Sequence, residues 1–142
     1  MEWNFRDAHL MTRWASNIDR NSPLPEYPRP HMERKEWYSL NGLWEYAITS
    51  KKLSSCEHWE GQILVPYPLE SALSGVMKAL KPTEYLWYRR HFQPLDRWKI
   101  NETMRVLLHF GAVDWECTIF VNGGKVGSHK GEIGRASCRE RV

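Results

Sequence analysis

The sequence predicts an all-β protein built as an antiparallel sandwich, and three features of the chain support this class. Short segments in which apolar and polar residues alternate recur along it, bounded by Pro, Gly or Asn. No long amphipathic stretch separates them, as helices connecting parallel strands would require. A chain of 142 residues suffices for about one domain with a single core.

The first 40 residues predict an extended N-terminal arm that precedes the sandwich. Four prolines lie within residues 21–30, and their fixed φ and missing amide hydrogens exclude both a helix and a central strand. We expect this segment to run over the surface, where it can pack on another domain. A short helix is expected in residues 11–19.

Residues 41–131 predict the sandwich itself. After Asn41-Gly42, Trp44, Tyr46 and Ile48 alternate with their neighbours, which indicates the first strand. Four further strands are expected at residues 63–65, 85–92, 105–110 and 116–121. A helical turn is expected within residues 70–80, because Leu69, Leu73, Met77 and Leu80 recur at helical spacing.

The strand at residues 116–121 leads into a sequence typical of a tight hairpin turn. Cys117, Ile119 and Val121 share one face of this strand. The following Asn122-Gly123-Gly124 supplies residues that accept a positive φ. A return strand should therefore begin at Lys125.

Three segments match a known family in both content and order. They are Pro28-Arg-Pro-His-Met-Glu-Arg-Lys-Glu-Trp37, Leu40-Asn-Gly-Leu-Trp44 and the stretch from Arg105 to Lys130. Together they resemble the N-terminal sugar-binding domain of glycoside hydrolase family 2, which includes β-galactosidases, β-glucuronidases and β-mannosidases. The resemblance implies a jelly-roll-like β-sandwich of the galactose-binding-domain type. It also implies a parent glycosidase that hydrolyses O-glycosyl bonds of terminal β-linked sugars with retention of configuration.

The length of the chain limits what it can do alone. In the family, two catalytic glutamates lie on a (β/α)₈ barrel that follows a second sandwich, and such a barrel needs about 250 residues. We therefore expect this chain to be a fragment without activity of its own, whose partners are carbohydrate and the downstream sandwich and barrel domains. The alternatives are a free-standing, non-catalytic carbohydrate-binding module and a scaffold domain without a ligand. The downstream reading frame would discriminate between them.

Residues 132–142 depart from the family, which continues with a glycine and an aromatic residue at this point. They are charged and weakly apolar, and they carry an unpaired cysteine. We expect an unrelated tail, of cloning or assembly origin, that adds nothing to the fold. The sandwich would then be incomplete at its C-terminal end.

The resemblance indicates three substrate-binding candidates. Glu70 lies in a loop that approaches the sugar pocket in several family members, and its carboxylate can accept hydrogen bonds from hydroxyls. An exposed or helix-capping glutamate is the plainer interpretation. His129 and Lys130 lie in a turn that faces the barrel in the family, and a solvated hairpin end is their alternative. No catalytic residue is predicted, because no motif marks a carboxylate pair or a nucleophilic serine.

Eight tryptophans also raise the possibility of carbohydrate stacking. Trp44 and Trp87 lie in strand patterns and are expected to serve packing. Trp37 and Trp59 lie outside the strands and stay open candidates.

Composition argues against several other classes. The net charge of +3 is dispersed, so no basic stripe predicts binding to nucleic acid. Three cysteines and six histidines show no metal-ligand spacing, so no metal or cofactor is expected. The N-terminus does not resemble a signal peptide, and no apolar run approaches the roughly 20 residues of a membrane helix. The expected location is therefore cytoplasmic by default, although many family members are exported.

Overall fold

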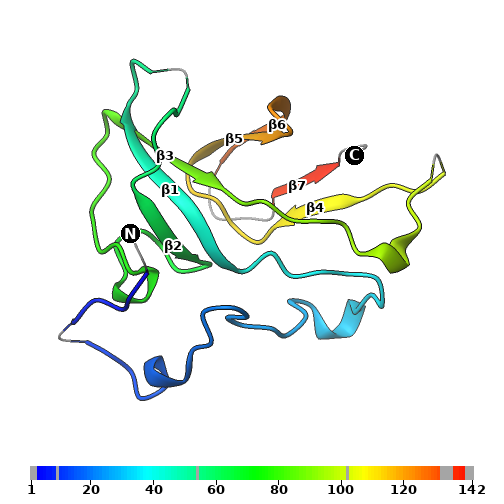
Figure 1. The fold of residues 1–142 in the computed structure, drawn as a ribbon, viewed down its shortest axis with the longest axis horizontal. Coiled ribbons are helices and arrows are strands. Elements are labelled where there is room, and N and C mark those ends of the chain that lie inside the picture. The colour runs from blue at the N-terminus through cyan, green and yellow to red at the C-terminus, as the bar shows by residue number, and fades with distance from the viewer. Residues whose placement is uncertain (1–2, 9, 54, 102, 132–135, 140–142) are drawn as a thin grey trace. The chain divides into compact units, whose positions relative to one another are not determined.

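All pairs of strands in the computed structural model are antiparallel (Figure 1). The structure describes residues 3–8, 10–53, 55–101, 103–131 and 136–139. No α-helix occurs in these ranges, so the predicted all-β class is confirmed. The jelly-roll arrangement stays a prediction. The chain forms two compact units, Met1–Gln93 and Pro94–Val142, and each is described by itself. The boundaries predicted near residues 40 and 131 also stay predictions.

The first unit contains a three-stranded sheet with the order β2-β1-β3 (Figure 1). Its strands are β1 (Gly42–Ser50), β2 (Gly61–Val65) and β3 (Glu84–Arg89). Trp44 is paired with Ile63 of β2, and Tyr46 is paired with Tyr88 of β3. The first three predicted strands are therefore present, although the third ends at Arg89 and not at residue 92.

A glutamate side chain extends the hydrogen bonding of β1 beyond the start of β2. The Glu60 amide donates to the Tyr46 carbonyl at 3.0 Å, and Glu60 Oε1 accepts from the Ile48 amide at 2.8 Å. Lys78 Nζ donates to the other carboxylate oxygen, also at 3.0 Å. Burial opposes the ionisation of Glu60, but the Ile48 amide and the Lys78 ammonium outweigh it and lower the pKa of this carboxyl.

The core of the first unit lies between one face of this sheet and the segment that follows β2. Tyr46, Ile63, Leu69 and Val76 form the buried cluster, and Trp44, Ile48 and Leu86 pack against it. This segment contains the 3-10 helix η3 (Ala72–Ser74), whose first turn is capped by the Ser71 hydroxyl. The predicted helical turn is thus confirmed but is only three residues long, because Gly75 ends it with a left-handed φ of 83°.

The N-terminal arm contains two further 3-10 helices, η1 (Ala15–Asn17) and η2 (Pro30–Met32). The first replaces the helix predicted for residues 11–19. Residues 21–29 form neither helix nor strand, as predicted, but the expectation fails at Pro30, which begins η2 because the fixed φ of proline suits the first position of a helix. Asn41 Nδ2 donates to the carbonyl of the buried Pro23 at 3.2 Å, which attaches this part of the arm to the start of the sheet.

The second unit begins with the 3-10 helix η4 (Asp96–Trp98) and continues with four strands. These are β4 (Leu107–Phe110), β5 (Glu116–Val121), β6 (Gly124–Lys130) and β7 (Ala136–Arg139). β5 pairs with β6, and β4 pairs with β7. Exposure alternates along β5 as predicted, with Ile119 only 8% exposed.

The turn between β5 and β6 has the predicted conformation. Asn122 has a φ of 50° and Gly123 a φ of 82°, as the two central residues of a type I′ hairpin turn require. The return strand begins at Gly124, one residue before the predicted start.

One expectation about the C-terminal segment is wrong. Residues 136–139 form β7 and pair with β4, whereas the sequence predicted no structural contribution from residues 132–142. The backbone of a strand edge pairs with any extended segment, so side-chain alternation is not needed for such a contact. The origin of this segment stays a prediction, and residues 132–135 and 140–142 lie outside the described residues.

The turn allows a direct test of backbone conformation. Gly123→Val should lower the free energy of unfolding by about 1–3 kcal/mol, because a β-branched residue is disfavoured at positive φ. Gly111→Val is the matched control: an added Cβ meets no atom within 4 Å at either glycine, but only Gly123 has a positive φ. Urea unfolding measures both variants, and equal losses would contradict the turn assignment.

The contribution of Glu60 to the free energy of unfolding should depend on pH. Since its pKa is lowered in the fold, its carboxylate stabilises the protein above the unfolded-state pKa of about 4.3, and this stabilisation disappears as the pH falls through the folded-state pKa. Glu60→Gln should cost about 0.5–1 kcal/mol at neutral pH after solvent screening, and less in acid. Thermal unfolding across this pH range, with the exposed Glu57→Gln as control, measures the difference. A loss that does not vary with pH would refute the assignment.

Candidate functional site

A cleft of about 570 Å³ lies in the first unit where β1 and β3 stop pairing. The last paired residues are Glu45 and Arg89, and beyond them the two segments diverge. The polar side chains that line the cleft include Asn21, Glu45, Gln62, Arg89, Arg90 and His91. This concentration of guanidinium, imidazole and amide groups makes the cleft a candidate site for a polar ligand.

Within this cleft, Arg89 is paired with a carboxylate of the protein. Its Nε donates to Glu45 Oε2 at 2.6 Å, and its guanidinium lies 4.3 Å from the centroid of the Trp59 ring. The hydrogen bond from Arg89 lowers the pKa of Glu45, although burial acts in the opposite direction. Arg89 therefore neutralises Glu45 and covers one face of Trp59.

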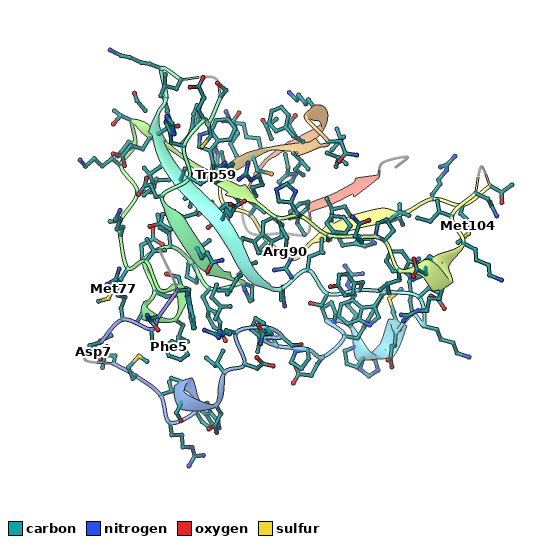
Figure 2. The ribbon with its side chains drawn as sticks, viewed as in Figure 1. Phe5, Asp7, Trp59, Met77, Arg90 and Met104 are labelled. Atoms are coloured by element: carbon teal, nitrogen blue, oxygen red, sulfur yellow. The ribbon has the colours of Figure 1, made fainter. Side chains whose placement is uncertain are left out.

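Arg90 is only partly satisfied. Its Nη1 donates to the Leu43 carbonyl at 2.7 Å, so the side chain occupies the place where β3 would have continued its pairing with β1. Gly42 makes room for it, because a Cβ at this position would lie 3.0 Å from Nη1. The Nε atom of Arg90 is buried and has no hydrogen-bond partner among the described residues. Figure 2 labels Arg90 and Trp59.

Glu70, the first predicted site residue, is exposed in the segment between β2 and η3. It acts on Tyr88, whose ring lies edge-on to Trp44 with centroids 6.4 Å apart. Tyr88 keeps 41% of its surface exposed, yet packing around it, together with the negative charge of Glu70, raises the pKa of its hydroxyl to about 12. The Glu70 carboxylate thus acts electrostatically on the Tyr88 hydroxyl.

His129 and Lys130, the other predicted residues, belong to the second unit and are neighbours on β6. His129 is paired with Cys117 and is half-buried. Lys130 is paired with Glu116, and its Nζ lies 3.5 Å from Glu116 Oε2. Since successive side chains of a strand point to opposite faces, the His129 and Lys130 side chains lie on opposite faces of the hairpin.

Trp44 packs against the buried core as the sequence predicted, whereas the packing role of Trp87 stays a prediction. Trp44 Nε1 donates to the Leu40 carbonyl, and Trp87 Nε1 donates to Thr49 Oγ1, each at 2.7 Å. Of the two open candidates, Trp37 packs edge-on against Tyr27 at 4.9 Å and Trp59 is covered on one face by Arg89.

Sequence reasoning missed Trp3, which anchors the N-terminal segment on the loop that carries Glu70. Trp3 is 6% exposed, and its Nε1 donates to the Ser74 carbonyl at 2.7 Å. Arg6 Nε donates to the Gly75 carbonyl at 2.9 Å. Figure 2 labels Phe5 and Asp7 of this segment beside Met77. A Cβ at Gly75 would lie 2.3 Å from Trp3 Nε1, so only glycine leaves room for the indole.

Two negative findings concern the described residues only. They contain no group of three or more His, Cys, Asp or Glu side chains that would hold a metal ion. They also contain no helix that is long and apolar enough to cross a membrane.

Comparison with known proteins relates the chain to a glycosidase. It is 28% identical, over 119 residues, to the beta-glucuronidase of Felis catus. The alignment covers 74% of this chain but 18% of that protein, so the chain spans less than a fifth of its relative. No family model matches the chain. The similarity agrees with the class of enzyme that the sequence motifs indicated.

The contact between Trp3 and Gly75 predicts that substitutions at these two positions, which are far apart in the sequence, affect stability in a coupled manner. Trp3→Ala should lower the free energy of unfolding by about 3 kcal/mol, as expected for removal of a buried aromatic ring. Trp14→Ala, which removes a ring that is 62% exposed, is the control. Gly75→Ala should also destabilise the protein, but less in the Trp3→Ala background, where the indole no longer obstructs the new methyl group. Additive losses in urea unfolding would contradict this contact.

Proposed function

We propose that this chain is the sugar-binding domain of a retaining glycoside hydrolase of family 2 that acts on terminal β-linked sugars. The observation that carries the proposal is the 28% identity to a beta-glucuronidase over 119 residues. The antiparallel strands and the hairpin at Asn122-Gly123 agree with the family resemblance that the sequence motifs indicated. The partners would be carbohydrate and the downstream sandwich and barrel domains.

In this proposal, the domain binds and positions sugar and takes no part in bond cleavage. Retaining hydrolysis requires two carboxyl groups about 5–5.5 Å apart, one as acid/base and one as nucleophile, and in this family both belong to the barrel. Glu70 is the side chain of the first unit best suited to the rim of such a pocket. Its carboxylate can accept hydrogen bonds from sugar hydroxyls, while Tyr88, on which its charge acts, supplies a partly exposed aromatic ring.

The Trp3 anchor supports this role for the Glu70 loop. The indole and Arg6 bind the carbonyls of Ser74 and Gly75, so the N-terminal segment fixes the far end of the loop. A fixed loop loses less conformational entropy when it orders around a ligand.

The first test is activity. The purified chain should show no turnover of aryl β-glucuronide, β-galactoside or β-mannoside, because it lacks the barrel. Turnover that disappears when a carboxylate of this chain is mutated would refute the proposal.

The second test concerns the gene, which should be sequenced across codon 131. The product of the longer reading frame should cleave one of these substrates with retention of configuration, as NMR of the released anomer would show. A reading frame without a barrel would favour a free-standing binding module.

In that longer enzyme, Glu70→Gln should raise KM by about tenfold with little change in kcat, because it removes a charge-assisted hydrogen bond from binding only. Glu57→Gln, another exposed glutamate of the first unit, is the control. An unchanged KM would remove Glu70 from the site without affecting the family assignment.

A further inference from the structure

We propose that the cleft between β1 and the Arg89–His91 segment is a binding site for a small hydroxylated carboxylate, whose carboxylate pairs with the Arg90 guanidinium. Glu70 is not among the residues that line this cleft, and the inference does not depend on the family of the parent enzyme. It rests on the geometry of one guanidinium group.

The first step compares Arg89 and Arg90 with the carboxylate in the cleft, which Arg20 and His91 also line. Glu45 is the carboxylate that lines it, and Arg89 holds this group at 2.6 Å. Arg90 uses Nη1 on the Leu43 carbonyl, a neutral acceptor. The positive charge of Arg90 therefore has no carboxylate of its own among the ion pairs of the described residues.

The second step concerns the unpaired nitrogen. A buried donor without an acceptor costs about 1–3 kcal/mol, and more when the donor is charged. Arg90 Nε is such a donor, and the side chain that carries it lines the cleft. A carboxylate beside this guanidinium would compensate its charge and offset the cost of the unpaired donor, because hydrogen bonds between ionised groups are about twice as strong as neutral ones.

The third step is the remaining lining of the cleft. A volume of about 570 Å³ is far larger than the ≈30 Å³ share of one water molecule and falls within the range of ligand pockets. Gln62 and Asn21 present amide groups that can bind hydroxyls, and Trp44 presents an aromatic ring. Trp44 Nε1 is held by the Leu40 carbonyl, so this ring is already oriented. An acid that also carries hydroxyl groups matches this combination.

The test observes Arg90 directly through the Nε–H resonance of the 15N-labelled full chain. Gluconate is the probe, acetate tests the carboxylate alone, and sorbitol is the neutral control of the same carbon length. Gluconate should shift the Arg90 Nε–H resonance in a saturable manner, acetate should shift it more weakly, and sorbitol should leave it unchanged. Sodium chloride is added to equalise ionic strength, so that a general salt effect is separated from binding.

Variants then assign the binding. Arg90→Lys keeps the positive charge but removes Nε, and should weaken gluconate binding by at least about tenfold, or about 1.4 kcal/mol. Arg105→Lys makes the same exchange in the second unit, and should bind gluconate as the parent does. If Arg90→Lys does not fold, the resonance of the parent protein still decides the question.

An Arg90 Nε–H resonance that responds to neither carboxylate would overturn the proposal. So would an equal response to sorbitol, which would indicate a site for neutral ligands, or an equal loss of binding in Arg105→Lys. Glycosidase activity of the longer enzyme enters none of these measurements, so the outcome is independent of the proposed function.

Discussion

The hydrogen-bonding requirement of β1 is the constraint on which the first unit depends. β1 has nine residues, whereas its neighbours β2 and β3 have five and six. Backbone amide and carbonyl groups need hydrogen-bond partners, so the parts of β1 that its neighbours do not reach must find other partners. Two charged side chains provide them: Glu60 accepts from the Ile48 amide on the β2 side, and Arg90 donates to the Leu43 carbonyl on the β3 side.

This arrangement explains why the sheet ends where it does. Alternation in the sequence continues through residue 92 and predicts a longer third strand, but pairing stops at Arg89 because Arg90 contributes its side chain to β1 instead of its backbone. The alternation of apolar and polar residues indicates which face of a strand a residue occupies. It does not indicate whether the backbone or the side chain of that residue forms the hydrogen bond to the neighbouring strand. The paired segments of β1, β2 and β5 and the Asn122-Gly123 turn were predictable, because alternation and positive φ are local properties.

The elements that the sequence did not reveal all depend on contacts between distant residues. Trp3 and Ser74 are 71 positions apart, and nothing in either neighbourhood distinguishes this indole from the other tryptophans. Gly75, which accommodates this indole, lies within the predicted helical turn, and local spacing does not reveal its contact with Trp3. β7 likewise pairs with a strand edge whose position local alternation does not specify. Of the predicted site residues, Glu70 acts electrostatically on Tyr88, whereas His129 and Lys130 lie on opposite faces of β6.

Arg89 and Arg90 show how adjacent residues of the same type acquire different chemistry. Arg89 is still within the ladder, so its side chain meets the Glu45 carboxylate on its own face and is neutralised there. Arg90 follows the last paired position, and its guanidinium meets a backbone carbonyl that satisfies one nitrogen and leaves the charge uncompensated. The end of the ladder therefore determines both the shape of the cleft and its residual positive charge. A longer β3 would remove both features together, because backbone pairing would then replace the guanidinium at Leu43.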